Sequence, residues 1–230
     1  MSHKSRALTH NDAAFHDPHN TSPRECPMMR DGGLFSIFSS CTIRAPPKAV
    51  YDAILDVQKW KEWNTFVTDV TITSHPHSHQ KDLKMTEGTH MTFHSQMTPK
   101  ERADSKEVCS HIGRLKTKED RPPRVTRIRW DFHNAGYLAP AFVVKAQRVN
   151  EIEEAEDGTT LYRTWETFGG WAAKTIKKKY EEALKEDYAR WSRDLKNYVE
   201  GERHEDGAAD AVAEGGQAGT EAVPEREYTV

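Results

Sequence analysis

The sequence has few cysteines and no long apolar segment. Its 230 residues include three cysteines, Cys26, Cys41 and Cys109, at wide spacing. An odd number of scattered cysteines does not indicate a disulfide framework, and it favours free thiols in a reducing compartment. No apolar run approaches the roughly 20 residues of a membrane-spanning helix, and the N-terminus lacks the apolar core of a secretion signal. The sequence therefore predicts a cytoplasmic protein with no transmembrane segment.

Several catalytic and cofactor-binding motifs are also missing. The sequence contains no glycine-rich phosphate-binding loop and no G-x-S-x-G nucleophile motif. Its one histidine cluster, at residues 75–79, has no cysteine or acidic partner at zinc-site spacing. We interpret this cluster as a solvated loop, with adventitious divalent-metal binding as the alternative. The sequence thus predicts neither a metal site nor a cofactor.

Both ends of the chain are poor in residues that build a core. Only two of the 21 aromatic residues, Phe15 and Tyr228, lie outside residues 34–200. Residues 201–230 contain no Leu, Ile, Phe, Trp or Met, and they carry eight acidic residues against two basic ones. Such compositions do not bury enough apolar surface to offset the entropy of ordering. We expect a disordered N-terminal arm at residues 1–33, one domain at 34–200 and a disordered acidic tail at 201–230.

The charge of the central domain is only mildly basic. Residues 1–33 are balanced and the tail is acidic, so the net charge of −3 leaves +3 for residues 34–200. This excess is too small to indicate a polyanionic partner. We therefore expect no nucleic-acid partner. We also expect a monomer.

Hydrophobic spacing changes along the domain in an informative order. Alternation predicts a first strand at residues 35–43, followed by two short helices from Pro47 onward. Alternation then returns, and it predicts six more strands at residues 67–73, 88–97, 105–116, 124–133, 142–154 and 159–168. Consecutive strands on short turns favour one antiparallel sheet with a face to bury.

The last element is a long amphipathic helix at residues 171–200. Apolar side chains recur on one face, lysines and glutamates occupy much of the other, and Gly201 is a stop signal. At 1.5 Å per residue the helix is about 45 Å long, enough to cross a sheet. The predicted fold class is α+β: a curved seven-stranded antiparallel sheet around a long C-terminal helix, with two short helices after the first strand. A cavity between sheet and helix is expected.

Three segments resemble a known family. Residues 43–52 (IRAPPKAVYD) and 60–64 (WKEWN) resemble the opening of the START-like, or SRPBCC, superfamily of polyketide cyclase/dehydrase and lipid-transport proteins. Residues 166–170 (ETFGG) resemble its closing motif. The resemblance covers about residues 34–200 and implies the Bet v-like helix-grip fold with an internal ligand pocket. The polar tails make the chain similar to family members from filamentous fungi.

Strand alternation predicts residues that face the pocket. Two strands each have one apolar face, and these faces carry Met91, Phe93, Ile128 and Trp130. At residues 159–168 both faces hold an aromatic side chain, so alternation leaves the inward face open. The resemblance implies that the inward face carries Tyr162, Thr164, Glu166 and Phe168. With Ile176 and Tyr180 from the long helix, these residues form the expected ligand site.

Glu166 is the first candidate catalytic residue. A carboxylate in a partly apolar cavity can have a raised pKa and act as acid or base, or accept a hydrogen bond from a ligand. The alternative is a structural salt bridge to Arg163, Lys174 or an arginine on a neighbouring strand. Tyr162 is the second catalytic candidate, and its alternative is an ordinary core residue with a satisfied hydroxyl. The connection at residues 136–140 is interpreted as a connector packed on the helix or as a pocket gate.

Two main functional hypotheses remain because the fold does not determine function. In the first, the protein binds a small hydrophobic molecule, a lipid or a polyketide-like compound, between the sheet and the helix. In the alternative, it is a polyketide cyclase or dehydratase of secondary metabolism that uses general acid/base chemistry in the same cavity. A third hypothesis is an interaction protein that uses its acidic tail.

Overall fold

A computed structural model describes residues 6–29, 32–79, 83–133 and 143–201. Two 3₁₀ helices come first, η1 (Ala13–His16) and η2 (Pro27–Met29). They are followed by β1 (Phe35–Ile43), α1 (Pro47–Leu55), the 3₁₀ helix η3 (Val57–Glu62), β2 (Val67–Ser74), β3 (His90–Thr98), β4 (Glu101–Ile112), β5 (Val125–Phe132), β6 (Lys145–Glu154), β7 (Thr160–Gly169) and α2 (Ala173–Glu200).

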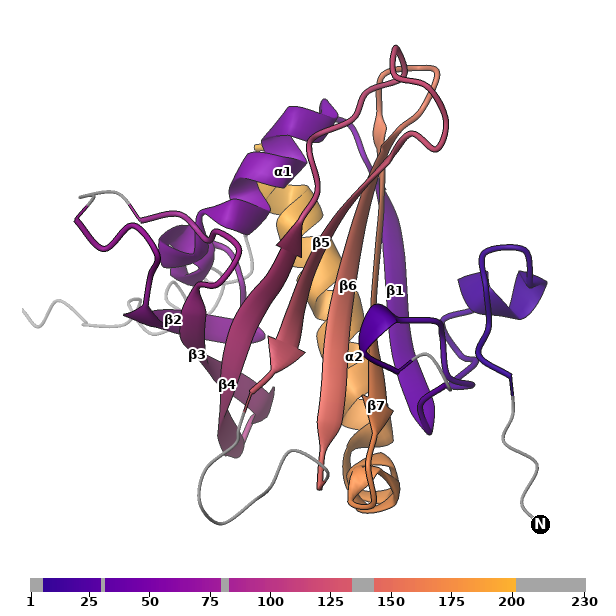
Figure 1. Cartoon of the computed structure of the whole chain (residues 1–230), viewed down its shortest axis with the longest axis vertical. Helices are drawn as coiled ribbons and strands as arrows, with labels where there is room; N and C mark the ends of the chain where they lie inside the picture. Colours follow the sequence, from indigo (N-terminus) through magenta and orange to yellow (C-terminus); the bar gives the residue numbers. More distant parts are fainter. Residues whose placement is uncertain (1–5, 30–31, 80–82, 134–142, 202–230) are drawn as a thin grey trace, which may run out of the picture.

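The strands form one antiparallel sheet in the order β1-β7-β6-β5-β4-β3-β2. The long helix α2 lies along one face of this sheet (Figure 1). The predicted α+β helix-grip fold is confirmed, with its seven strands and the two short helices after β1. None of the helices in the described residues is both long enough and apolar enough to cross a membrane.

The strand boundaries follow the sequence signals except at β4. The pattern predicts this strand at residues 105–116, but it begins at Glu101 and ends at Ile112. Pro99 and Lys100 form a tight turn, so Glu101 pairs at once with Thr98 of β3. Residues 101–104 mix charges without alternation, which hides their strand character from the hydrophobic pattern.

Helix α2 ends where the sequence predicts. Gly201 takes the left-handed conformation at φ 76°, which glycine adopts without a side-chain penalty. Its N–H group donates to the carbonyl of Asn197 at the last turn. At 1.5 Å per residue, the 28 residues of α2 extend about 42 Å. The helix packs mainly along β1, with smaller contacts to β7 and β3.

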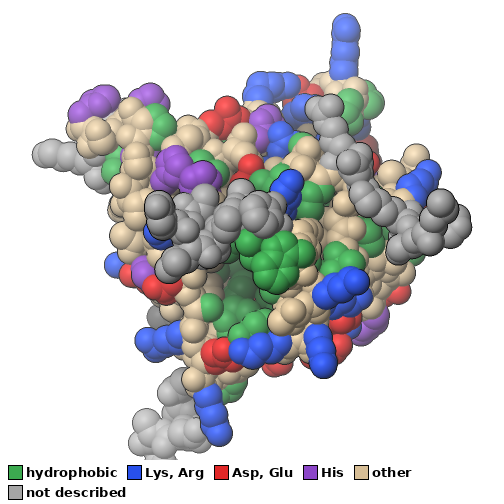
Figure 2. Space-filling model, turned by 60° about the horizontal axis from the view of Figure 1, so that its bottom comes forward, with side chains coloured by type: hydrophobic (Ala, Val, Ile, Leu, Met, Phe, Trp, Pro, Cys, Tyr) green, Lys and Arg blue, Asp and Glu red, His purple; other side chains and the backbone are tan. Residues whose placement is uncertain are grey.

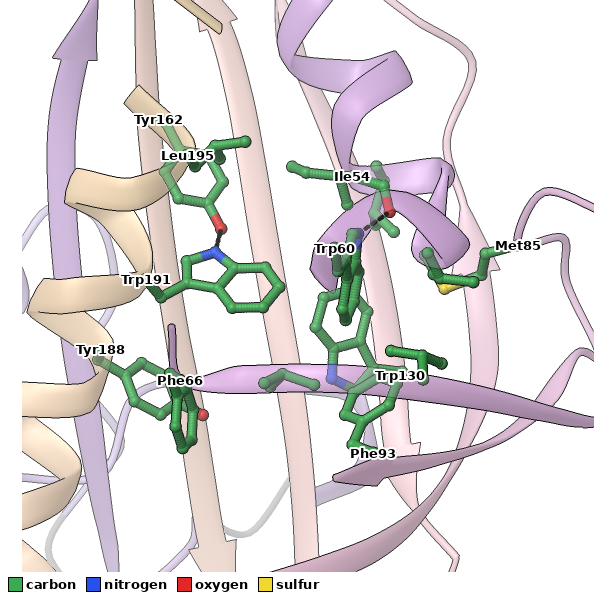
Figure 3. Close-up of a cluster of buried hydrophobic side chains, with 14 of the residues drawn as sticks. Ile54, Trp60, Phe66, Met85, Phe93, Trp130, Tyr162, Tyr188, Trp191 and Leu195 are labelled. Atoms are coloured by element: carbon green, nitrogen blue, oxygen red, sulfur yellow. Dashed lines mark hydrogen bonds between the residues drawn. The ribbon is translucent and has the colours of Figure 1, made fainter. Parts of the chain in front are cut away.

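An aromatic cluster fixes the short helices against α2 and the sheet. Trp60 of η3 packs edge-on against Trp191 of α2 at 4.8 Å between ring centroids, and Trp130 of β5 lies 5.8 Å from Trp60 (Figure 3). The indole N–H of Trp191 donates to the Tyr162 hydroxyl at 2.8 Å, and that of Trp60 donates to the Ile54 carbonyl at 3.2 Å. Each buried aromatic side chain removes roughly 150–250 Å² from water, so this cluster dominates the core.

Residues 6–29 pack on the outer face of the sheet, opposite α2 (Figure 1). Phe15 is fully buried there, with ring centroids 5.1 Å from Trp165 of β7 and 5.7 Å from Phe38 of β1. The disorder expected for residues 1–33 therefore does not hold for residues 6–29. The sheet supplies an apolar outer surface that the arm covers, and the arm's own composition gives no sign of that surface.

Arg24 holds the loops of this segment together. It is fully buried, and its guanidinium donates to the carbonyls of Phe15 at 2.8 Å, Asp17 at 2.8 Å and Asn20 at 3.0 Å. Burial lowers the pKa of Arg24 to about 10, so it remains charged at neutral pH. Its guanidinium carbon also lies 4.6 Å from the Phe38 ring centroid, within cation–π range.

A buried carboxylate fastens the segment to the sheet. Glu151 of β6 accepts from His10 at 3.0 Å, Arg127 at 2.8 Å and Arg163 at 3.0 Å. Burial opposes ionisation of Glu151, but the His10 hydrogen bond and the positive charges around it outweigh burial and lower the pKa to about 2. The carboxylate therefore links the N-terminal segment with two strands.

Candidate functional site

A cavity of about 190 Å³ lies between the inner face of the sheet and α2. Its lining residues come from the segment at Phe66, from strands β2 to β7, from Val144 just before β6, and from α2. They lie toward the end of the molecule at the bottom of Figure 1, and Figure 2 shows hydrophobic side chains around a hollow on that side. Most of the cavity wall is apolar, with six polar members: Ser95, Ser105, Glu107, Arg148, Glu166 and Tyr188.

Arg148 is a buried cation held by aromatic rings. Its guanidinium carbon lies 4.1 Å from the Trp191 ring centroid, 4.3 Å from that of Tyr188 and 5.4 Å from that of Trp130. Its Nε atom donates to the Thr164 hydroxyl at 3.1 Å. One terminal amino group has no hydrogen-bond partner in the described part of the chain. Ring faces stabilise the charge while leaving these N–H groups available to a ligand.

Two buried carboxyl groups share this cavity. Glu166 of β7 stands opposite Arg148 in the β6–β7 register, and it accepts a hydrogen bond from the Tyr188 hydroxyl of α2. Glu107 of β4 has one carboxyl oxygen without a partner among the described residues. Only 6% of Glu107 is exposed, so this oxygen is shielded from solvent in the cavity wall.

The two carboxyls differ in their surroundings. Burial raises the pKa of Glu107 well above its usual range, and the charge of Glu166 raises it further. Burial also raises the pKa of Glu166, and the Tyr188 hydroxyl and the Arg148 charge offset only part of that rise. One cation stands beside one carboxylate, so Glu166, next to Arg148, ionises more readily than Glu107, which holds its proton more strongly. Such a pair provides a base and an acid to the same bound molecule.

Comparison with known proteins decides the family. Residues 43–180 match the family described as polyketide cyclase/dehydrase and lipid transport, which covers more than half of the chain. The chain belongs to this family. Proteins of the polyketide cyclase family bind hydrophobic small molecules, and both the binding and the cyclase hypotheses are compatible with this membership.

Individual relatives agree with this assignment. Oxopyrrolidines biosynthesis cluster protein O of Penicillium oxalicum is 28% identical over 177 residues, which cover 72% of this chain and 86% of the relative. A hypothetical protein of Helicobacter pylori has a similar solved structure, with a TM-score of 0.53, 13% identity and coverage of 71% of this chain and 86% of the other. TTHA0849 of Thermus thermophilus gives a TM-score of 0.50, 13% identity and coverage of 71% and 96%. The two solved structures share the fold of this chain.

Half of the ten sequence-predicted site residues line the cavity between the sheet and α2: Phe93, Trp130, Glu166, Phe168 and Ile176. Four others face the same side of the sheet but are buried in the surrounding core: Met91, Ile128, Tyr162 and Thr164. Tyr180 is half-buried on α2, away from the cavity, and its hydroxyl donates to Glu101 at 2.8 Å. The inward face assigned to residues 159–168 is thus the one the structure shows.

Tyr162 is a fully buried core residue whose hydroxyl is hydrogen-bonded to protein groups. Its hydroxyl donates to the Asn150 side chain at 2.7 Å and accepts from Trp191 at 2.8 Å. Burial raises the pKa of Tyr162 to about 12. Tyr162 does not line the cavity, and its hydroxyl already has two protein partners. It is therefore not placed to act on a ligand in the cavity.

Sequence reasoning missed Glu107, Arg148 and Tyr188. Alternation in β6 places Arg148 on the same face as the buried Ala146 and Ile152, and this is the sequence signal for its inward position. Glu107 has no comparable signal, because its inward neighbours on β4 are small or polar. The salt bridge considered between Glu166 and Arg163 is absent, since Arg163 faces outward and pairs with Glu151 and Glu153. The alternative of an arginine on a neighbouring strand comes nearest to the structure, because Arg148 of β6 stands opposite Glu166 and its charge lowers the pKa of that carboxyl.

Other sequence expectations have different outcomes. Cys26, Cys41 and Cys109 are all free thiols. Across the described ranges, no group of three or more His, Cys, Asp or Glu side chains is arranged to hold a metal ion. The connection at residues 136–140 and the acidic tail beyond Gly201 lie outside the described residues.

Proposed function

We propose that this protein is an acid/base enzyme of the cyclase or dehydratase type that acts on a small β-dicarbonyl compound of secondary metabolism. One observation carries the proposal: Glu107 and Arg148 are buried in the wall of an apolar cavity, and each has a polar atom without a partner among the described residues. Buried polar atoms are almost always satisfied, so such atoms in a cavity wall indicate a ligand.

The proposed roles follow from the charges. Glu166 is the base, because Tyr188 and Arg148 favour its ionised form. Glu107 is the acid, because burial and the charge of Glu166 both raise its pKa. Arg148 stabilises negative charge that develops on a substrate oxygen, since its free N–H groups are already held in position. Tyr162, the second catalytic candidate from the sequence, keeps only a supporting role in this proposal.

The chemistry balances over two steps. Glu166 removes a proton from the carbon between two carbonyls, and Arg148 stabilises the enolate. The enolate carbon bonds to a further carbonyl carbon of the same molecule, outside the β-dicarbonyl unit, and the oxygen of that carbonyl takes the proton of Glu107. For dehydration, the Glu107 carboxylate then removes an adjacent C–H proton, and the proton on Glu166 leaves with the hydroxyl as water. Dehydration thus returns both carboxyls to their starting states; when the cyclised alcohol leaves without dehydration, Glu166 gives its proton to water and Glu107 takes one from water.

The size of the cavity limits the substrate. Its volume of about 190 Å³ is below the roughly 300–1,000 Å³ typical of pockets for drug-sized ligands. The substrate is therefore compact, or it extends from the cavity through the hollow seen in Figure 2. The name of the Penicillium oxalicum relative, a biosynthesis cluster protein, supports a small metabolite as substrate.

A carrier without catalysis is the second candidate. The largely apolar wall, with Phe93, Trp130, Phe168 and Leu184, favours binding of a hydrophobic molecule whether or not it reacts. For either function we propose a monomer in the cytoplasm, a location that the three free thiols fit.

Turnover of a linear tetraketide thioester of N-acetylcysteamine separates the two functions, because its C2 carbon can close a six-membered ring on the C7 carbonyl with loss of water. Product formation with loss of water is followed by mass spectrometry for the wild type, Glu107→Gln and Glu166→Gln. Glu182→Gln, on the exposed face of α2, is the matched control. General acid/base catalysis predicts a loss of about 100-fold or more in both cavity variants and none in the control.

Unchanged turnover in Glu107→Gln and Glu166→Gln would contradict the assigned roles. Binding of the thioester without turnover, with equal affinity in the wild type and both variants, would favour the carrier. Thermal unfolding of each variant establishes that the losses do not come from unfolded protein.

A further inference from the structure

A second pocket lies on the outer face of the sheet, away from the internal cavity. Its volume is about 340 Å³, and it is formed between the N-terminal segment and strands β5, β6 and β7. Figure 1 shows the N-terminal segment crossing β6 and β7 on the side opposite α2. The pocket wall combines apolar side chains with positive charge. Met29, Val149 and Trp165 are apolar, whereas Arg127 and Arg129 are cationic.

The two arginines are not equivalent. Arg127 donates to the buried Glu151 at 2.8 Å, so its charge is used to hold the segment in place. Arg129, two residues further along the same face of β5, has no hydrogen bond or ion pair within 4 Å in the described part of the chain. Its side chain is partly buried, and burial together with the neighbouring Arg127 disfavours its charge. A bound anion would relieve that repulsion.

Nearby acids do not neutralise Arg129 directly. Asp131 accepts from the Gln147 amide at 2.6 Å and from the Ser110 hydroxyl at 2.8 Å. Glu87 accepts from the Ile112 N–H at 2.7 Å. Both carboxylates attract Arg129 at longer range but leave its planar set of N–H donors unused.

One further acid of the lining selects the charge of the ligand. Glu25 stands exposed at the edge of the pocket. A ligand with two negative charges would be repelled by Glu25, whereas a single carboxylate can pair with Arg129 in the two-pronged geometry typical of arginine. The buried Trp165 and Val149 provide an apolar surface for the rest of the molecule.

We propose that this outer pocket binds a small planar monocarboxylate, with the carboxylate on Arg129 and the apolar body against Trp165 and Val149. The site is independent of the internal cavity, because the two walls share no residue. Since the wall combines the N-terminal segment with the sheet, ligand binding stabilises the packed form of that segment.

The probe for this site is 2-naphthoate, with 2-naphthamide as its uncharged analogue. The reporter is the indole N–H of Trp165, which donates to the Glu25 carbonyl at 3.1 Å and lies in the pocket wall. Two-dimensional NMR follows this resonance and that of Trp130, which lines the internal cavity. Calorimetry gives the affinities for the wild type, for Arg129→Met and for the control Arg102→Met, whose side chain bonds to Gln96 on β3.

Binding of 2-naphthoate should shift the Trp165 resonance and leave that of Trp130 in place. Arg129→Met should weaken binding about tenfold or more, as loss of a charged hydrogen bond does, and Arg102→Met should leave it unchanged. The 2-naphthamide should bind the wild type no better than 2-naphthoate binds Arg129→Met. Equal affinity of Arg129→Met and wild type, equal binding of amide and carboxylate, or a shift of Trp130 alone would overturn the proposal. Urea unfolding midpoints establish that both variants are folded.

Discussion

Single buried residues set the chemistry of the internal cavity. Arg148, Glu107 and Glu166 bring one positive and up to two negative charges into a space with few water-exposed atoms. Desolvation of that kind costs stability unless each charge has a partner or a proton. Proteins retain such groups at functional sites, because an acid and a base with separated pKa values are what proton-transfer chemistry needs.

The raised pKa of Glu107 predicts a specific pH dependence of stability. Above the unfolded-state pKa of about 4.5, unfolding releases the proton that the folded state keeps, so stability falls as pH rises toward the folded-state pKa. Glu107→Gln removes this loss, which reaches at most about 1.4 kcal/mol per pH unit. Urea unfolding between about pH 5 and about pH 7 should show that the unfolding free energy of the variant, relative to that of the wild type, increases as the pH rises. Parallel curves for the two proteins would contradict the assignment.

The hydrogen bond from Tyr188 to Glu166 can be tested separately from the roles of Glu107. Tyr188→Phe removes the hydroxyl that donates to Glu166, and the change should raise the pKa of that carboxyl further. Loss of the hydrogen bond to a buried charged group should lower the unfolding free energy by about 1.5–3 kcal/mol. Carbon-13 NMR titration of the glutamate carboxyls and urea unfolding measure the two effects. Tyr198→Phe, on an exposed tyrosine of the same helix, serves as the control and should change neither.

The sequence indicated some of these residues and not others. Alternation correctly placed Phe93 and Trp130 inward, because an apolar stripe on a strand has one stable orientation. The family resemblance was needed for Glu166, since both faces of its strand carry an aromatic ring. Glu107 and Arg148 were missed because a charged residue in a strand is usually solvated. Only the covering helix α2 makes these two positions internal.

Among the structural elements, the N-terminal segment shows how a polar stretch can become ordered. Its composition alone does not support a core, yet Phe15 and Arg24 are fully buried. The segment completes a cluster that begins with Phe38, Val149 and Trp165 on the outer face of the sheet. A sheet face left apolar in this way would otherwise be exposed to water or to other chains.

Phe15→Ala should release this segment selectively. The substitution removes the ring that packs on Phe38 and Trp165, and burial of a Phe side chain is worth about 3–5 kcal/mol when the site does not collapse. Hydrogen exchange should accelerate at backbone amides such as those of Leu8 and Glu25, which bond within the segment, while α2 stays protected. Equal acceleration throughout the sheet and α2 would show instead that the segment is part of a single cooperative unit.

The strands and helices themselves were largely visible in the sequence. Strand β1, helix α1 and helix α2 have the strongest periodicity and clear boundary residues, and they form where expected. Strand β4 was shifted, because its first residues pair with β3 through a turn that has no glycine. The docking of residues 6–29 could not be predicted from local patterns, since it depends on a surface that β1 forms together with β6 and β7 from the other end of the domain.

At the scale of the whole molecule, each face of the single sheet contributes to one pocket. Helix α2 covers the inner face and encloses the cavity with its acid, base and cation. The N-terminal segment covers part of the outer face and forms the second pocket. Family membership explains the first arrangement, while the second depends on the segment of this chain that precedes β1.

Infrared difference spectroscopy between the wild type and Glu107→Gln tests directly whether the cavity contains a protonated acid. We predict a C=O stretching band of a protonated carboxyl in the wild type at about pH 7, because burial and Glu166 keep the proton on Glu107. That band should be absent from Glu107→Gln and present in Glu182→Gln. A wild-type spectrum with only ionised carboxylates at this pH would contradict the proposed acid/base pair, since the cavity would then contain no acid to complement its base.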